Sequence, residues 1–175
     1  MALGHRMTAA RLGDGALWLH SPVACSAVLV AELAKLGPVA HVVAPNCMHD
    51  TYLEGWFTAY PAARFHGAKG FSRFRPDLKF TDTLGDTPHA AWTGTFDQHL
   101  VRGLPRLNEV VFLHRATHTL IVTDLAFNLR SAMPLLSRVL LRINDCYGKF
   151  GPSRMLRGIV KDRAALRASL DHILA

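Results

Sequence analysis

The sequence predicts a mixed α/β fold, and three observations predict it. A strand, a helix and a second strand follow one another between residues 16 and 44. Two apolar β-branched runs flank a short polar turn between residues 109 and 125, and helical periodicity returns between residues 133 and 174. This order indicates a parallel strand pair, then a hairpin, then a helical end.

The strand–helix–strand unit has the most regular pattern. Ala16–Val23 is rich in strand-forming residues and contains Ser-Pro, which ends a strand. Cys25–Leu36 carries apolar residues at helical spacing before Gly-Pro, and Val39–Ala44 is a second apolar run closed by a proline. Because such a crossover builds a parallel pair with its helix on one face, we expect a βαβ unit.

The middle of the chain has weaker patterns. Tyr52, Trp56 and Tyr60 recur at helical spacing and predict a short helix that Pro61 ends. Residues 62–106 are rich in Gly, Pro and Asp, which favours short strands between turns. We expect such strands at Ala63–His66, Leu78–Phe80 and His99–Arg102.

The clearest strand pattern lies further along the chain. Glu109–His114 and Thr119–Leu125 are apolar and β-branched, and the polar turn 115–118 between them predicts a hairpin in the core. Met133–Ile143 and Asp162–Leu174 have helical composition, with glycines and a proline breaking the chain between them.

Composition bounds the class of protein. A chain of 175 residues is long enough for one core, so we expect a single domain over residues 1–175. The 50% apolar and 19% charged content excludes a disordered chain. Three widely spaced cysteines indicate neither a disulfide framework nor a zinc ribbon. With no signal-peptide core and no apolar run long enough to span a membrane, we expect a soluble cytoplasmic protein.

The positive charge gathers at the C-terminal end. Residues 126–175 hold nine Lys and Arg against three Asp, which is +6 of the total net charge of +7. Such a segment attracts acidic partners by long-range electrostatics, although a solvated helix surface is the commoner explanation. No aromatic residues alternate with these charges as stacking platforms for bases, so the sequence disfavours nucleic-acid binding.

Three blocks of sequence resemble a known family. These blocks are GALWLHSPV, HVVAPNCMHDTYLEGWFTAYPAA and LNEVVFLHRATHTLIVTDLAFN. Their order and spacing resemble the family catalogued as domain of unknown function 4336. That family is similar to a divergent branch of the metallo-β-lactamase superfamily. The resemblance implies a four-layer αββα sandwich with a metal site at one edge of its two sheets. Because this chain ends early relative to the family, we expect its last strand or strands to be absent.

The resemblance also implies a depleted ligand set. Where the superfamily has its His-x-His-x-Asp-His loop, this chain has Pro45-Asn46-Cys47-Met48-His49-Asp50, in which proline can ligate nothing. A later histidine position falls near Leu104, which is equally inert. Asp124, at the end of TLIVTD, stands where the superfamily has an aspartate that often bridges two metals.

The predicted metal ligands are therefore His49, Asp50, His114 and Asp124, with His20 as a further candidate. A metal held there would be zinc or iron, and three ligands with an open position suit water activation. The alternative is structural: Asp124 caps a turn, the histidines pack with one nitrogen hydrogen-bonded, and His49-Asp50 opens a helix.

Three neighbouring residues have simpler interpretations. Cys47 near a helix start is a possible nucleophile or soft ligand, but a buried, inert cysteine is commoner. Asn46 is expected to cap the following helix. His118 lies in the polar turn and is expected to be exposed, so it is left out of the site.

Two functions follow from these features. One is a divergent metallo-hydrolase-like enzyme in which the depleted ligands hold a metal against an ester, amide or phosphoester. The other is a non-catalytic scaffold that binds a small molecule or an acidic protein partner, as folds commonly do when their sites decay.

Overall fold

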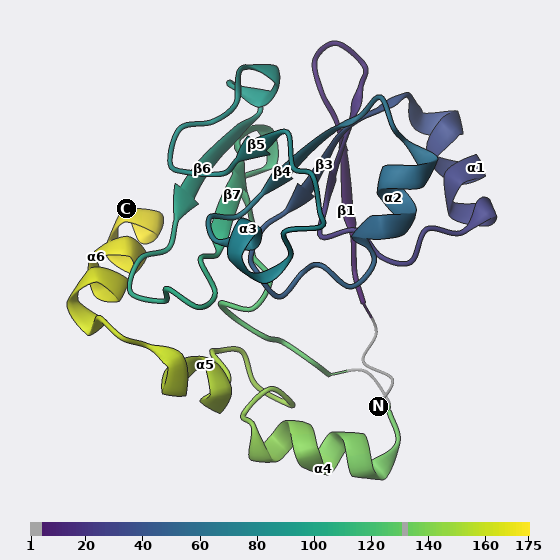
Figure 1. The fold of residues 1–175 in the computed structure, drawn as a ribbon. Helices are drawn as coiled ribbons and strands as arrows, with labels where there is room; N and C mark the ends of the chain where they lie inside the picture. Colours follow the sequence, from purple (N-terminus) through teal and green to yellow (C-terminus); the bar gives the residue numbers. More distant parts are fainter. Residues whose placement is uncertain (1–4, 131–132) are drawn as a thin grey trace.

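The computed structural model describes residues 5–130 and 133–175. The expected βαβ unit forms the centre of its larger sheet (Figure 1). β2 (Leu17–His20) and β3 (Val39–Ala44) pair in parallel, and α1 (Ala27–Leu36) crosses between them. The Ser26 hydroxyl accepts the Leu29 N–H at 3.2 Å and caps the helix.

Three more strands complete this sheet in the order β1-β2-β3-β4-β5. β1 (Thr8–Arg11) is antiparallel to β2, whereas β4 (Arg64–Gly67) and β5 (Asp82–Thr83) continue the parallel arrangement. The short helices α2 (Leu53–Ala59) and α3 (Phe71–Phe74) follow β3 and β4. The carboxyl ends of β2 and β3 therefore meet at one edge, where parallel sheets place their ligands.

The predicted hairpin is confirmed in the second sheet. β6 (Phe96–Leu100), β7 (Val110–His114) and β8 (Thr119–Ile121) are antiparallel neighbours in that order. The turn between β7 and β8 ends at His118, which adopts a left-handed conformation at φ 49° and is exposed, as expected.

Some expectations about the strands were wrong. β1 was not predicted, because its sequence Thr-Ala-Ala-Arg has little strand character and its pairing with β2 makes it a strand. Leu78–Phe80 is not a strand; Leu78 and Phe80 instead pack from a loop into the core beneath the first sheet. The expected strand His99–Arg102 begins earlier, at Phe96.

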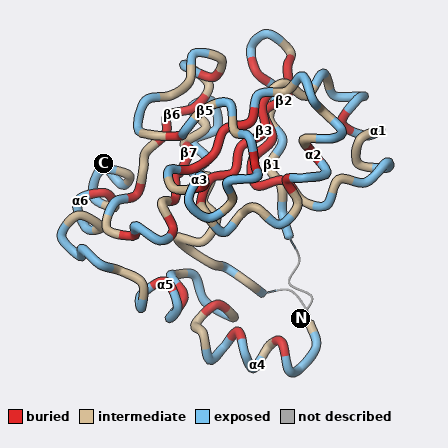
Figure 2. Tube along the Cα trace, in the orientation of Figure 1, coloured by how far each residue is buried: buried red, intermediate tan, exposed pale blue. Residues whose placement is uncertain are grey.

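Three apolar clusters define four layers. Trp18 and Val43 of the first sheet meet Phe96 and Phe112 of the second, which fills the space between the sheets. The outer face of the first sheet packs against α1, α2 and α3, and the outer face of the second packs against α5 and α6. Burial is concentrated along the central strands (Figure 2). The predicted αββα sandwich is confirmed.

The helical C-terminal end consists of α4 (Leu135–Ile143), α5 (Arg154–Ile159) and α6 (Arg163–Leu174). Two of these were expected, but α5 was not; its N-cap is Ser153, whose hydroxyl accepts the Leu156 N–H at 2.9 Å. In the described residues after β8, β structure is limited to two isolated bridges, Phe127 with Gly151 and Leu129 with Tyr147.

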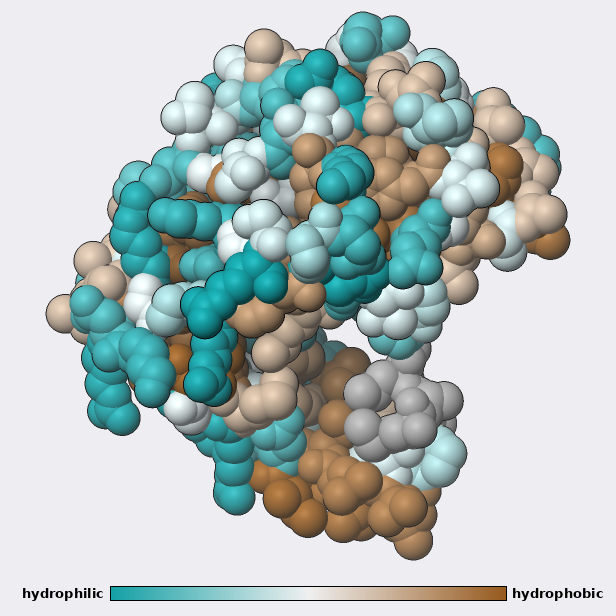
Figure 3. All heavy atoms as spheres, in the orientation of Figure 1, coloured by the Kyte–Doolittle hydropathy of each residue, from teal (hydrophilic) through white to brown (hydrophobic). Residues whose placement is uncertain are grey.

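α4 lies apart from the two sheets (Figure 1), and its apolar side chains form a surface of their own (Figure 3). Leu135, Leu136 and Ile143 are 66, 71 and 59% exposed. No helix among the residues described is both long and apolar enough to cross a membrane.

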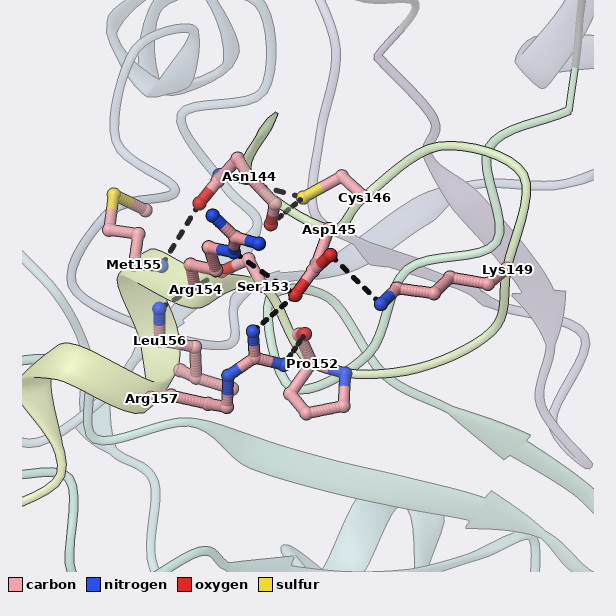
Figure 4. A network of polar contacts seen from close by, with 10 residues as sticks. All are labelled: Asn144, Asp145, Cys146, Lys149, Pro152, Ser153, Arg154, Met155, Leu156 and Arg157. Carbon is pink, nitrogen blue, oxygen red and sulfur yellow. Dashed lines mark hydrogen bonds and ion pairs between the residues drawn. The ribbon is translucent and has the colours of Figure 1, made fainter. Parts of the chain in front are cut away.

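An ion cluster joins the end of α4 to α5 (Figure 4). The Asp145 carboxylate accepts from Lys149 at 2.9 Å, from Arg154 at 3.3 Å and from Arg157. Lys149 and Arg157 hold the pKa of Asp145 well below its usual value. All three cations are about half exposed or more, at 54, 64 and 48% of their side chains.

Candidate functional site

Three chain segments meet at the edge where β2 and β3 end. Ser21 directly follows β2, the loop after β3 carries Asn46 and His49, and Asp124 follows β8 of the other sheet. Ser21 has a left-handed backbone with φ 55°, and its N–H donates to the Val43 carbonyl at 2.9 Å. The sheet edge therefore holds this serine in a conformation that non-glycine residues rarely adopt.

A chain of hydrogen bonds runs through these side chains. Ser21 Oγ lies 2.6 Å from His49 Nδ1, and His49 Nε2 lies 3.2 Å from Asp124 Oδ2. Ser21 is 7% exposed, whereas the side chains of His49 and Asp124 are 26 and 22% exposed. Burial raises the pKa of Asp124, but hydrogen bonds from His49 and Asn46 outweigh it, so the net pKa lies below its usual value. Asp124 is thus a carboxylate near neutral pH.

Asn46 supports this carboxylate from the buried side. Its Nδ2 donates to Asp124 Oδ2 at 2.8 Å and to Thr123 Oγ1 at 2.9 Å, while its Oδ1 accepts the Met48 N–H at 2.8 Å. The expectation that Asn46 caps the next helix was wrong, because α2 begins later and Asn46 closes a turn within its own loop. A fully buried amide with partners on both atoms fixes the loop against Asp124.

Glu109 is a site residue that sequence reasoning missed. It is fully buried, and its carboxylate accepts the backbone N–H of Thr123 at 2.7 Å and of Asp124 at 2.9 Å. Burial raises the pKa of Glu109 to about 7, against the lowering effect of these hydrogen bonds. The only indication in the sequence is one acid at the start of an otherwise apolar strand, and the hairpin pattern alone gives that acid no role in a site.

Ser21 was missed for a different reason. The Ser-Pro pair was interpreted as the end of a strand, which it is, but that interpretation assigns the hydroxyl no role. A serine just past a buried parallel strand was the available indication, since side chains at that position face the ligand edge.

The structure brings together two of the four predicted ligands, His49 and Asp124. Asp50 turns away and pairs with Arg75 Nη1 at 2.7 Å. His114 lies at the far end of β7 from Glu109, about 17 Å further along the extended chain. There its Nδ1 lies 2.7 Å from Thr117 Oγ1.

The two further candidates, His20 and Cys47, lie next to the site in the chain but make other contacts. His20 is buried and stacks on Trp18 with ring centroids 5.3 Å apart, and burial, helped by the charge of His49, lowers its pKa to about 3. Its Nε2 has no hydrogen-bond partner in the described part of the protein. Cys47 Sγ donates to the Lys69 carbonyl at 3.3 Å, and burial raises its pKa, which disfavours the alternative of a nucleophilic thiol.

This arrangement does not fit a zinc or iron ion. A catalytic site needs about three protein ligands around an open position. Within residues 5–130 and 133–175, no three His, Cys, Asp or Glu side chains are grouped so that they could hold a metal ion. His49 and Asp124 hydrogen-bond each other, and Asn46 donates to the same carboxylate oxygen, Oδ2.

A family model matches most of the chain. The model of the family described as domain of unknown function DUF4336 matches residues 1–146. The chain belongs to the DUF4336 family. Every residue of the Ser21–His49–Asp124 chain, with Asn46 and Glu109, lies inside the matched range, whereas α5 and α6 lie beyond it. No match was found among proteins with curated descriptions.

Solved structures show the fold of this DUF4336 member. It is similar to the crystal structure of the DIM-1 metallo-β-lactamase exposed to ceftazidime, with a TM-score of 0.54 and 12% sequence identity. The match covers 95% of this chain and 91% of that chain. At this identity the likeness concerns the fold alone, so the chemistry must be argued from the side chains at the edge.

Proposed function

We propose that this chain is a hydrolase-related domain of the metallo-β-lactamase-like fold that works without a metal ion at its site edge. The observation that carries the proposal is the use of the donor atoms: Asp124 Oδ2 accepts from both His49 and Asn46. A metal ion at Oδ2 would therefore have to displace one of these two hydrogen bonds.

The surroundings support the same proposal. Asp50 is taken by Arg75, a cation that disfavours a second positive charge nearby. Glu109 holds the backbone of Thr123 and Asp124 in place by accepting both N–H groups. The edge is therefore ordered by its own polar network.

Metal content of the purified protein, measured by inductively coupled plasma mass spectrometry, tests this proposal. We expect zinc and iron far below one ion per chain, before and after incubation with either metal. His49→Ala and Asp124→Ala should leave this low content unchanged. The matched control is Asp97→Ala, whose carboxylate binds Arg115 near the opposite end of β7 from Glu109, and it should leave the content unchanged as well. Near-stoichiometric metal that disappears in the His49 and Asp124 variants but not in the control would overturn the proposal.

A second candidate function is binding of an acidic partner by the C-terminal end. Asp145 neutralises part of the charge, but Lys161 and Arg163, further along the chain, are exposed. We expect an acidic polypeptide, poly-glutamate, to bind at low salt and dissociate at high salt, as measured by fluorescence anisotropy. Lys161→Glu combined with Arg163→Glu should abolish binding, and equal binding by this variant would exclude the role.

A further inference from the structure

The chain of hydrogen bonds at the sheet edge has the three parts of a serine-based acyl-transfer site. A hydroxyl, an imidazole and a carboxylate are joined in that order by contacts of 2.6 and 3.2 Å. They come from residues 21, 49 and 124, so the tertiary fold assembles them. Such a site is recognised by geometry and by the role of each group rather than by the order of residues in the chain.

The proton positions follow from the hydrogen-bonding capacity of each group. The Asp124 carboxylate can only accept, so His49 Nε2 must carry the proton of that contact. In a neutral imidazole the other nitrogen, Nδ1, then has a free lone pair and accepts the Ser21 O–H. The base is therefore already aimed at the proton it would remove, within the distance that general-base catalysis requires.

The backbone of Ser21 adds an independent indication. Its left-handed conformation at φ 55° places the hydroxyl at a sharp turn immediately after a buried parallel strand. Nucleophilic serines of α/β hydrolases stand on strained strand-end turns for the same reason, because the turn lifts the hydroxyl out of the sheet. Strain held at a polar edge, beside a base, points to function.

We propose that Ser21 is a nucleophile, with His49 as its general base and Asp124 as the group that orients His49, and that it accepts the acyl group of a small carboxylic ester. This rests on the proposed metal-independent function. The small exposed fraction of Ser21 limits the size of the acyl group. Because Ser21 is 7% exposed, an unbranched short acyl group such as acetyl reaches Oγ more readily than a long or branched one.

The reaction balances without any further reactant except water. Ser21 Oγ forms a bond to the acyl carbon as its proton passes to His49 Nδ1, and the carbonyl electron pair moves to oxygen. That pair returns as the bond to the alcohol breaks, and the alcohol leaves with the proton from His49. Water then repeats the sequence on the acyl-serine, which releases the acid and restores the hydroxyl.

Covalent labelling of the full chain with diisopropyl fluorophosphate tests the assignment. Oγ attacks phosphorus, the P–F bond breaks, and fluoride leaves with the serine proton. We expect one adduct by intact mass, located at Ser21 by peptide mapping, and none in Ser21→Ala. His49→Ala should label at least about 100-fold more slowly. Added imidazole should restore part of that rate, which a merely structural defect would not allow.

Ser72→Ala provides the matched control, because Ser72 is an exposed serine on α3 outside the network. It should label like the wild type, and p-nitrophenyl acetate should turn over faster than the p-nitrophenyl ester of a long acyl chain. A folded wild type, judged by circular dichroism, that forms no adduct or is labelled elsewhere overturns the role of Ser21. If that protein is also metal-free, the metal-independent function stands and only the nucleophile fails. If it holds stoichiometric metal, the proposed function fails as well.

Discussion

Two polar networks in this protein differ in how they are built. At the sheet edge, buried Asn46 and Glu109 support Asp124, and the partners are separated by up to 78 positions in the chain. Around Asp145, the partners lie within 12 positions of one another, and their side chains are 48–64% exposed (Figure 4).

The difference teaches where polar groups are costly to remove. A buried donor that loses its acceptor suffers the full penalty of desolvation, whereas an exposed ion pair exchanges its partner for water. Substitutions in the edge network should therefore lower the stability of the protein strongly, and salt should change this loss little. Substitutions in the Asp145 cluster should lower stability less, and salt should change that loss more.

The largest effect is expected for Glu109→Ala. This change leaves the backbone N–H groups of Thr123 and Asp124 buried without an acceptor, so the free energy of unfolding should fall by roughly 2–4 kcal/mol. Urea unfolding at neutral pH measures this loss. Glu109→Gln keeps the shape and one acceptor oxygen, so it should cost clearly less; equal losses in both variants would mean that packing, not the two hydrogen bonds, is responsible.

A smaller effect is expected in the pH dependence of stability. The pKa of Glu109 is about 7 in the folded protein and 4.5 for an unperturbed glutamate, so the folded state binds more protons between these values. The contribution of Glu109 is therefore fully present below pH 4.5 and is lost as pH rises through 7, by at most about 3 kcal/mol.

Glu109→Gln removes this titration. Relative to the wild type, the variant should gain stability as pH rises from 4.5 to 7 in urea unfolding experiments. Buried His20, whose pKa is lowered to about 3, acts in the opposite direction in both proteins, because only the unfolded state binds its proton below pH 6.5. The difference between the two proteins isolates Glu109, and parallel pH profiles would show that its carboxylate does not titrate in this range.

The smallest effect is expected for Asp145→Ala. The loss of stability should be less than for Glu109→Ala and should shrink further at high salt, because the partners are solvated. Thermal unfolding at low and high salt checks this, with Asp171→Ala as a control that breaks only the exposed pair with Arg167. A loss as large as that of Glu109→Ala, unchanged by salt, would erase the distinction between the two networks.

Local patterns in the sequence were sufficient for much of the fold. Val39–Ala44 was predicted with its observed bounds, because an apolar run that ends at a proline can be recognised from neighbouring residues alone. The hairpin of β7 and β8 and the helices α1, α4 and α6 followed from periodicity in the same way. β1 could not be found like this, since only its pairing with β2 makes Thr8–Arg11 a strand.

The site depended on the tertiary structure. His49 and Asp124 were predicted as site residues from the family resemblance, but the sequence carried no information on which of their neighbours would join them. The placement of individual side chains in the fold decides which residues join the site. Asp50 turns to Arg75, and His114 lies at the opposite end of β7. Ser21, in contrast, comes within 2.6 Å of His49. Periodicity, set by residues a few positions apart, by itself determined the mixed α/β class and most of the strands and helices. Contacts across 28 and 75 positions, set by how the two sheets pack, determined the chemistry of the edge.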